Sequence, residues 1–223
     1  DITRTIAIGP PGNEERTAFT RVLQGMIAIS RLRWPKGLAG RDIEAVGRVP
    51  LWLAGQDFDH GIGHGVGHFL GVHEGPQRLS RVSQVPLDPG MILSNEPGYY
   101  REGAFGIRIE NLVVVCKAGV PKGGDVHRVM YDFETLTYVP IDHRLIRTDL
   151  LNAAELKWIS QQGSYRPIPV ICFTHPTSIN VGPNGAISPT MINVSGYNLG
   201  DKDRVAIRLV HRDGPGPPLD PRF

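Results

Sequence analysis

The sequence has few of the features that mark disulfide-rich, membrane or nucleic-acid-binding proteins. Its two cysteines, Cys116 and Cys172, lie in apolar runs and do not make a disulfide framework. We therefore expect both cysteines to be small buried apolar residues of a protein in a reducing compartment. No apolar run approaches the roughly 20 residues that cross a bilayer, and no signal peptide is visible. The formal net charge is only +2, without a basic run, which gives no support to a nucleic-acid or membrane partner.

The remaining composition is that of an ordinary globular protein. Of the 223 residues, 40% are hydrophobic and 21% are charged, so a buried core is feasible. The 27 glycines and 19 prolines indicate many tight turns.

The first half of the chain opens with one predicted strand and two predicted helices. Residues 1–8 alternate polar and branched side chains, which predicts a strand. Apolar residues recur at helical spacing from Glu14 to Trp34, which predicts a helix that ends at Pro35. A second helix is predicted from about Arg41 to Leu53, weakened in its last turn by Pro50.

Three apolar runs then predict β-strands, at residues 90–100, 105–117 and 133–141. A closing helix is predicted over residues 149–162. Because strands and helices are segregated rather than alternating, the pattern predicts the α+β class.

The character of the chain changes from about Ser164, where proline, glycine and asparagine become frequent and short β-like runs appear. We therefore expect two parts, a domain at residues 1–163 and a β-rich tail at residues 164–223 that looks like a truncated Ig-like segment. A tail of about 60 residues has little room for a core of its own, so marginal stability is expected.

The residues that point to chemistry are carboxylates and histidines in or beside the predicted strands. Hard divalent ions such as Mn²⁺ prefer clustered carboxylates with a histidine, and the sequence offers Asp1, His64, Glu96 and Glu110. Glu110 lies between Ile109 and the run "NLVVV", so burial of that strand would bury an acid. A metal ion is one way to compensate a buried carboxylate.

Each of these residues taken alone has a plainer interpretation. A single glutamate in a strand usually faces solvent, and a single histidine is more often a surface or hydrogen-bonded core residue. His68 stays in that category, because nothing in "GVGHFLGV" assigns it a role. The four residues together, beside "HGIGHGVG", favour a metal site, because glycine permits close backbone approach to a ligand. Composition alone indicates no more than a candidate metal hydrolase.

Three stretches carry a family resemblance: "DFDHGIGHGVGHFLGVHEGP", "LDPGMILSNEPGYYREGAFGIRIENLVVV" and "FETLTYVPID". In this order they resemble the C-terminal catalytic domain of Xaa-Pro aminopeptidases (aminopeptidase P), which are pita-bread metallopeptidases alongside methionine aminopeptidases and prolidases. The resemblance covers roughly residues 1–160, and "HEGP" with "NEPGYY" favours aminopeptidase P over methionine aminopeptidase. It implies the pita-bread fold, with antiparallel sheets and flanking helices.

The resemblance implies a dinuclear metal site, most often with Mn²⁺, while Zn²⁺ or Co²⁺ would also be compatible. By position, Asp1 and Glu110 would bridge the two ions, and His64 and Glu96 would hold one of them.

The resemblance also implies the residues that act on substrate. His60 and His73 would be catalytic and substrate-binding residues that line the pocket without holding metal. Glu96 would carry a proton from water to the departing proline nitrogen. Further pocket residues would be Tyr99, Tyr100 and Arg108, although core or surface packing is an equal alternative for the tyrosines.

The implied function is hydrolysis of the bond between an N-terminal residue and a penultimate proline, by a cytoplasmic enzyme. The implied partners are peptides with proline at position two and a second copy in a homodimer, without nucleic acid or membrane. Two alternatives stay open: a prolidase, which takes only dipeptides, and a non-catalytic pita-bread binding module. Retention of His64, Glu96 and Glu110 argues against the module, because such relatives usually lose the metal ligands.

The sequence departs from the family pattern at both ends. The family carries a first metal-binding aspartate shortly before the position of Asp1, and an N-terminal domain before that. We therefore expect a truncated chain in which one metal keeps four ligands and the other only the two bridges, with impaired activity. The edge of the strand at residues 1–8 would be exposed, and residues 164–223 have no counterpart in the family.

Overall fold

The computed structural model describes residues 1–69, 71–162, 173–175 and 190–195. Its strands are β1 (Thr3–Ile8), β2 (Arg33–Pro35), β3 (Gly63–His64), β4 (Arg78–Leu79), β5 (Ile92–Asn95), β6 (Gly98–Arg101), β7 (Phe105–Arg108), β8 (Asn111–Lys117), β9 (Met130–Thr135), β10 (Phe173–His175) and β11 (Thr190–Ser195). Its helices are α1 (Asn13–Ser30), α2 (Gly40–Ile43), α3 (Val49–Trp52) and α4 (Ala153–Gln162), with 3₁₀ turns η1 (Glu44–Gly47), η2 (His143–Leu145) and η3 (Thr148–Leu150).

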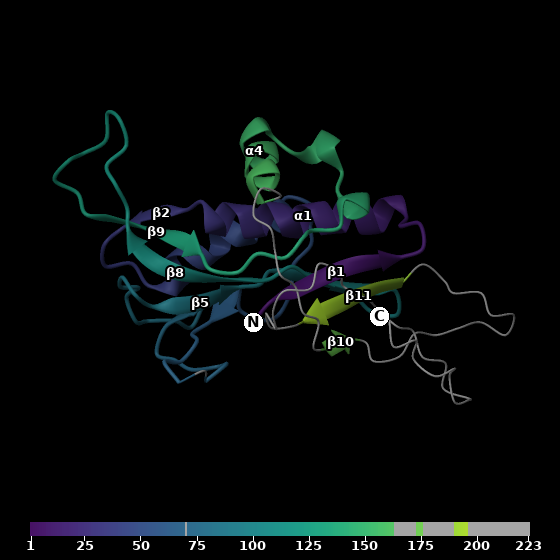
Figure 1. Ribbon diagram of the computed structural model, residues 1–223, viewed down its shortest axis with the longest axis horizontal. Helices are drawn as coiled ribbons and strands as arrows, with labels where there is room; N and C mark the ends of the chain where they lie inside the picture. The colour runs from purple at the N-terminus through teal and green to yellow at the C-terminus, as the bar shows by residue number, and fades with distance from the viewer. Residues whose placement is uncertain (70, 163–172, 176–189, 196–223) are drawn as a thin grey trace, which may run out of the picture.

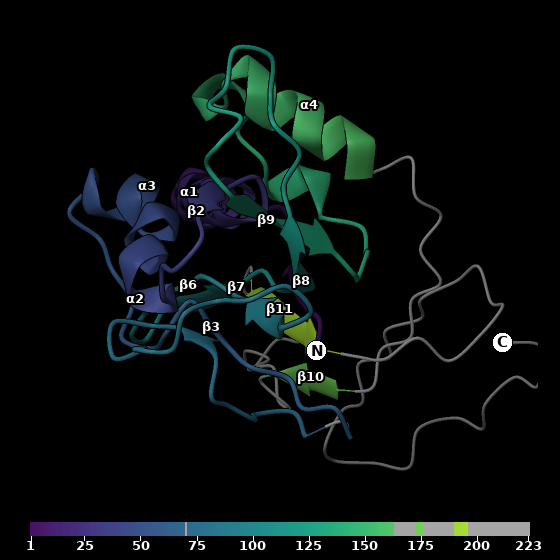
Figure 2. The same cartoon turned by 90° about the vertical axis from the view of Figure 1, so that its left-hand side faces the viewer.

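The strands pair in antiparallel fashion in four sheets. The largest has the order β2-β9-β8-β5, another has the order β1-β11-β10, and β3-β4 and β6-β7 form two-stranded pairs. Helix α1 lies between these strands and α4 (Figure 1), and α2 and α3 lie to one side of it (Figure 2). The predicted α+β class is therefore confirmed.

Helix α1 supplies the centre of the core. Its predicted apolar face is buried, with Phe19, Leu23 and Met26 each 0% exposed. Glu14 and Glu15 occupy its first turn, where carboxylates interact favourably with the helix dipole. Burial of each large apolar side chain stabilises the fold by about 1.5–3 kcal/mol, so this face anchors the strands that carry the site.

Two predicted helices differ from the structure. Helix α1 ends at Ser30 rather than Trp34, because Trp34 pairs with Tyr131 in the sheet and its ring lies 4.5 Å from that of Phe133. The predicted helix at residues 41–53 is divided into α2, η1 and α3. Pro50 lies in the first turn of α3, where its missing N–H is tolerated, and does not weaken a last turn.

The predicted strands are also divided, and the breaks coincide with the acids. The run at residues 90–100 turns at Glu96, so β5 joins the largest sheet while β6 pairs with β7. The run at residues 105–117 is interrupted at Glu110, which bridges to Thr3 instead. The last predicted strand begins earlier, at Met130, and ends at Thr135.

The tail contributes two described strands. β11 pairs with β1 along its whole length, from Thr3 opposite Ser195 to Ile8 opposite Thr190. The prediction of an exposed edge on this strand is therefore wrong along that side, because β11 occupies it. The rest of the expected Ig-like segment lies outside the described residues, and the boundary after residue 163 stays a prediction.

The cysteine prediction is wrong for Cys116, which is partly exposed and free. Buried and partly exposed residues alternate along β8, and Cys116 falls on the partly exposed face with Val114. Its Sγ lies 3.7 Å from Glu134 Oε2. Cys172 lies outside the described residues. Within the described part of the chain, no helix combines the length and the apolar character that crossing a bilayer requires.

Candidate metal centre

Four chain segments bring the predicted acidic and histidine residues together. Asp1 precedes β1, His64 ends β3, Glu96 follows β5, and Glu110 lies between β7 and β8. His64 Nε2 lies 3.1 Å from Glu96 Oε1 and 3.6 Å from Asp1 Oδ2. His64, Glu96 and Glu110 each offer a ligand atom, and these atoms lie within 4.8 Å of one another. The arrangement offers one nitrogen and several oxygens, a donor set that suits a hard divalent ion.

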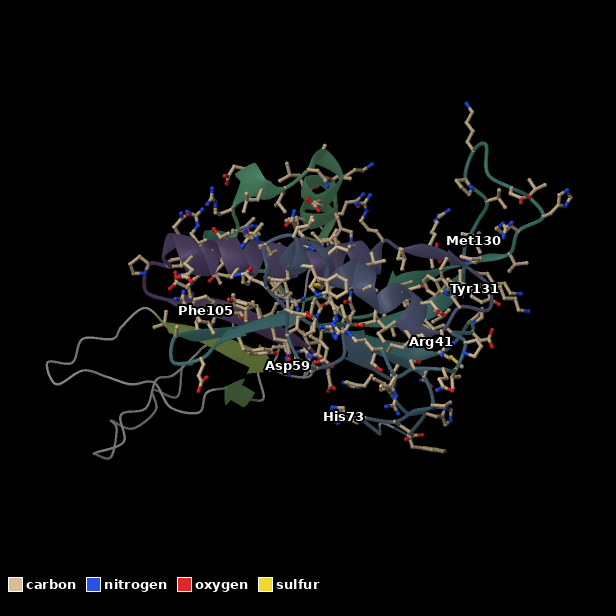
Figure 3. All side chains as sticks on the ribbon, turned by 180° about the vertical axis from the view of Figure 1, so that it is seen from behind. Arg41, Asp59, His73, Phe105, Met130 and Tyr131 are labelled. Atoms are coloured by element: carbon tan, nitrogen blue, oxygen red, sulfur yellow. The ribbon has the colours of Figure 1, made fainter. Side chains whose placement is uncertain are left out.

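His73 lies closer to this centre than the sequence prediction anticipated. Asp1, His64 and His73 form a second group with ligand atoms within 4.8 Å. The rings of His64 and His73 are 4.2 Å apart between centroids. Figure 3 shows His73 on the loop at the lower edge of the molecule. His73 was predicted to line the pocket, and it does so within reach of the same donors.

Ser94 and the glycines around His64 fix the position of its ring. The Ser94 hydroxyl accepts from the His64 backbone N–H at 2.9 Å and donates to Glu96 Oε1 at 2.9 Å. His64 Nδ1 lies 3.0 Å from the Gly65 carbonyl. An Nδ1–H donor to that carbonyl leaves Nε2 facing the carboxylates.

The glycines do permit close packing, but against the backbone rather than toward the candidate ligands. A Cβ on Gly63 would lie 1.8 Å from the Ser94 carbonyl oxygen, and one on Gly65 would lie 2.1 Å from the Glu74 carbonyl oxygen. Larger residues at either position would push β3 away from its neighbours. Glycine at these positions therefore lets β3, which carries His64, pack directly against β5 and the following loop.

Glu110 is the buried acid that the sequence predicted, at 4% exposure. Burial, followed by the charge of Glu96, raises the pKa of Glu110. Thr3 Oγ1 donates to Glu110 Oε2 at 2.5 Å. Arg4 donates to the Glu110 carbonyl at 2.6 Å and to Asn111 Oδ1 at 2.7 Å, and burial lowers the pKa of Arg4 to about 10. The carboxylates of Glu96 and Glu110 thus lie close together and largely buried, a situation that a cation would relieve.

His64 and Glu96 stabilise each other's charged forms. Burial would raise the pKa of Glu96, but the hydrogen bond from His64 and the charge of Arg108 together lower it. Burial would lower the pKa of His64, but its contacts with Glu96 and the Gly65 carbonyl raise it. His64 Nε2 is the atom that faces the carboxylates of Asp1 and Glu96, and its lone pair would be available to a metal ion when that nitrogen carries no proton.

A hydrogen-bonded chain leads from His60 to the same carboxylate. His60 Nε2 lies 2.9 Å from the Tyr100 hydroxyl, which accepts from Arg108 Nε at 2.9 Å. Arg108 Nη1 lies 3.7 Å from Glu96 Oε2. Burial, with the charge of Arg108 opposing ionisation, lowers the pKa of His60. Tyr99 lies against Phe105, with ring centroids 6.1 Å apart.

A cavity of about 540 Å³ opens on these groups. The candidate site residues that line it are His60, His64, His73, Glu96 and Arg108. Its remaining walls come from the chain around β4, including Arg78, Ser80 and Val82. This volume suits a short peptide. His68 instead packs its ring 4.6 Å from that of Phe69.

The structure also reveals supporting residues that the sequence analysis missed. Thr3 and Ser94 hold Glu110 and Glu96, respectively. A signal exists for Ser94, which lies two residues before Glu96 on a predicted strand, where positions i and i+2 share a face. Thr3 lies two residues after Asp1, but its partner is the distant Glu110. Arg4 and Arg48 gave no such signal, because their contacts toward the site are with residues distant in sequence or in an irregular loop.

Comparisons with known proteins agree with this site. Residues 1–117 match the family described as Metallopeptidase family M24, and residues 129–162 match the C-terminal region of peptidase M24. Probable Xaa-Pro aminopeptidase P of Tuber melanosporum is 46% identical over 164 residues, which cover 72% of this chain and 26% of that protein. Aminopeptidase P2 of Arabidopsis thaliana is 46% identical over 164 residues, covering 72% of this chain and 23% of that protein. The chain thus spans about a quarter of these curated relatives.

Solved structures show the same similarity. X-prolyl aminopeptidase from Caenorhabditis elegans, described as a cytosolic enzyme with a di-nuclear active site, matches with TM-score 0.69 and 36% identity. The match covers 74% of this chain and 26% of that one. Xaa-Pro dipeptidase from Bacillus anthracis matches with TM-score 0.51 and 33% identity, covering 64% and 36%. The predicted pita-bread fold is confirmed.

Proposed function

Because the chain belongs to metallopeptidase family M24, we propose that it is the catalytic region of a metal-dependent Xaa-Pro aminopeptidase. Its reaction is hydrolysis of the bond between an N-terminal residue and a penultimate proline. The observation that carries the proposal is the convergence of Asp1, His64, Glu96 and Glu110 beside a peptide-sized cavity. Curated relatives at 43–48% identity are Xaa-Pro aminopeptidases or probable ones, which favours this reaction within the family.

We propose that the donor set fits two divalent ions, Mn²⁺ with Zn²⁺ and Co²⁺ as alternatives, and that the ion held by the bridging carboxylates alone binds more weakly, so that turnover is impaired. Asp1 and Glu110 would bridge the ions, while His64 and Glu96 would hold one of them. The fit is supported by the buried carboxylates, whose mutual repulsion contributes to the raised pKa of Glu110. When bound, a pair of divalent ions lowers the pKa of water and makes hydroxide available near neutral pH.

Glu96 is suited to accept and return the proton of the attacking water. Its lowered pKa keeps the carboxylate ionised at neutral pH, as a proton acceptor requires. Its two oxygens have different surroundings: Oε1 faces His64 and Ser94, while Oε2 faces Arg108. Proton transfer to the departing proline nitrogen would restore the carboxylate.

His60 and His73 stand on the cavity wall on either side of His64 in sequence. We assign them to substrate binding and to stabilisation of the tetrahedral intermediate. The lowered pKa of His60 keeps its ring neutral at pH 7, so it acts as a hydrogen-bonding group rather than a cation. Arg108 lines the same cavity. Of the two predicted tyrosines, Tyr100 contacts His60, whereas Tyr99 packs against Phe105, because adjacent side chains on β6 point to opposite faces.

The substrates in this proposal are peptides with proline at position two. A cytoplasmic location is proposed from the C. elegans relative, which is described as cytosolic. A homodimer is proposed from the family resemblance alone, and sedimentation of the purified chain tests it.

Metal content and turnover measured on one sample test the function. The full chain is dialysed against Mn²⁺, bound metal is counted, and cleavage of Arg-Pro-Pro is compared with Arg-Ala-Pro and with the dipeptide Arg-Pro. About two ions per chain and release of arginine from Arg-Pro-Pro only would support the proposal. Cleavage of Arg-Pro only would indicate a prolidase. Absence of both metal and turnover would refute catalysis by this chain, and the same result after the upstream segment of an aminopeptidase P is added would favour a binding module.

A further inference from the structure

A buried ion-pair network lies beneath the segment that carries His60. The side chain of Arg48 is only 3% exposed, and its Nε donates to Glu44 Oε2 at 2.8 Å. Its Nη1 donates to Asp57 Oδ1 at 2.8 Å. Arg81 contacts Glu44 and Asp57 from the solvent side, at 3.3 Å and 3.0 Å. The network therefore joins α3 and η1 to the start of the histidine-containing segment.

Two further N–H groups of Arg48 hold the backbone of that segment. Nη1 donates to the Phe58 carbonyl at 2.7 Å, and Nη2 donates to the His60 carbonyl at 2.6 Å. The guanidinium also lies 4.0 Å above the Phe58 ring. Asp57 Oδ1 accepts from the Phe58 N–H at 2.9 Å. One side chain thus holds the Phe58 and His60 carbonyls, on either side of Asp59.

These contacts reach the cavity through the His60 ring. The Phe58 ring lies 4.7 Å from the His60 ring, which turns Nε2 toward the Tyr100 hydroxyl. His64 is held by different partners, namely Ser94 and the pairing of β3 with β4. The backbone of each histidine is therefore held by its own partners, although the two rings are linked through Tyr100, Arg108 and Glu96.

We propose that Arg48 is a positioning residue for His60: it sets the height and direction of the His60 ring in the cavity without acting on the metal ligands. This inference rests on the proposed function for its kinetic consequence, but the positioning itself does not depend on activity. Arginine suits the task because its planar fork can serve two carboxylates and two carbonyls at once. A lysine would keep the charge but lose that geometry.

A double-mutant cycle on the Mn²⁺-loaded full chain tests the proposal. Arg48→Lys is expected to lower kcat about 10- to 100-fold, because small displacements of a reacting group have large effects. KM should rise as well, because His60 also binds substrate, whereas the Mn²⁺ content should change less than about twofold, because Arg48 does not contact the metal ligands. In a His60→Ala background, Arg48→Lys should add little further loss, because Arg48 acts through His60. Equal losses in both backgrounds would overturn the proposal.

Arg4→Lys is the matched control. Arg4 is also buried, and it donates to the carbonyl of Glu110 rather than to that of His60. Its substitution is expected to weaken Mn²⁺ binding and to combine additively with His60→Ala. If Arg4→Lys and Arg48→Lys show the same coupling to His60→Ala in kcat, the losses reflect general destabilisation, which would contradict a specific role of Arg48.

Histidine-ring NMR supplies a measurement that needs no turnover. In ¹H–¹⁵N spectra of the full chain, Arg48→Lys should shift the ring signals of His60, identified with His60→Ala, and leave those of His64 in place. Unmoved His60 signals would overturn the positioning role. Shifted signals in a parent protein that cleaves no Xaa-Pro peptide would sustain that role and refute the proposed function. If Arg48→Lys does not fold, Asp57→Asn is measured instead and should also shift the His60 ring signals. Unchanged His60 signals in Asp57→Asn would count against the proposal.

Discussion

Replacement of Gly63 by alanine would test how the site is seated in the fold. The new Cβ would lie 1.8 Å from the Ser94 carbonyl oxygen, 2.7 Å from its carbon and 3.1 Å from its hydroxyl. Because the first two atoms are backbone, no side-chain rotation relieves the clash, and β3 must move away from β5. Overpacking of this kind costs about 1–3 kcal/mol. For an ordered region of this size, that corresponds to a decrease in Tm of about 2–12 °C.

The same displacement should weaken the metal site, since the His64 N–H would lose its bond to the Ser94 hydroxyl. Thermal unfolding of the full chain and Mn²⁺ titration measure the two effects. Gly119→Ala is the control, because nothing lies within 4 Å of a Cβ at that position. Its stability should stay within about 0.5 kcal/mol of the parent. If Gly63→Ala keeps the parental stability and Mn²⁺ affinity, the close packing of β3 on β5 does not position His64, and the reasoning is refuted.

Three further predictions concern two groups at the site and one that contacts β1. Ser94→Ala removes the hydroxyl that bridges the β3 backbone and Glu96. Calorimetric titration should therefore show Mn²⁺ affinity lowered about 10- to 100-fold. Unchanged affinity would contradict a role of Ser94 in holding the metal ligands. Glu110→Gln removes the charge that burial and Glu96 disfavour. Mn²⁺ binding should fall, whereas the metal-free protein at pH 8 should unfold at the same or a higher temperature. A lower unfolding temperature without metal would be inconsistent with repulsion between Glu110 and Glu96. Burial would raise the pKa of Asp142, but hydrogen bonds from Arg144 and the β1 backbone lower it from its ordinary 3.8. Stability from Asp142 is therefore present above about pH 4 and lost as pH falls through its folded pKa. Asp142→Asn should cost about 1 kcal/mol at pH 7 and less at pH 3 in denaturant unfolding, whereas a deficit independent of pH would rule out the charged interaction.

The site has two kinds of support with separate structural origins. Thr3, Ser94 and Arg4 hold the carboxylates and the strands that carry them. Arg48 holds the segment around His60. Perturbation of the first group should appear in metal binding, and perturbation of the second in turnover. The comparison of Arg4→Lys with Arg48→Lys separates the two, because metal binding and turnover are both measured on these variants.

Local sequence pattern was sufficient for the parts of the fold that depend on periodicity. The apolar face of α1 repeats every three or four residues, and the structure buries that face. The buried acid at Glu110 was predictable from its place between apolar strand residues. The four candidate ligands were identifiable from residue type, spacing and family motifs, and the structure brings them together.

Tertiary structure decided where the pattern was interrupted and which distant groups meet. Trp34 lies in β2 and not in the predicted helix, because this sheet position buries its ring against Phe133. Thr3 and Glu110 are 107 positions apart, yet they share a hydrogen bond. Arg48 reaches His60 across an irregular loop. No local period encodes such contacts, because they arise from the packing of strands and loops that are distant in sequence. The sequence alone determined which groups could perform the chemistry, whereas the fold determined how each is held.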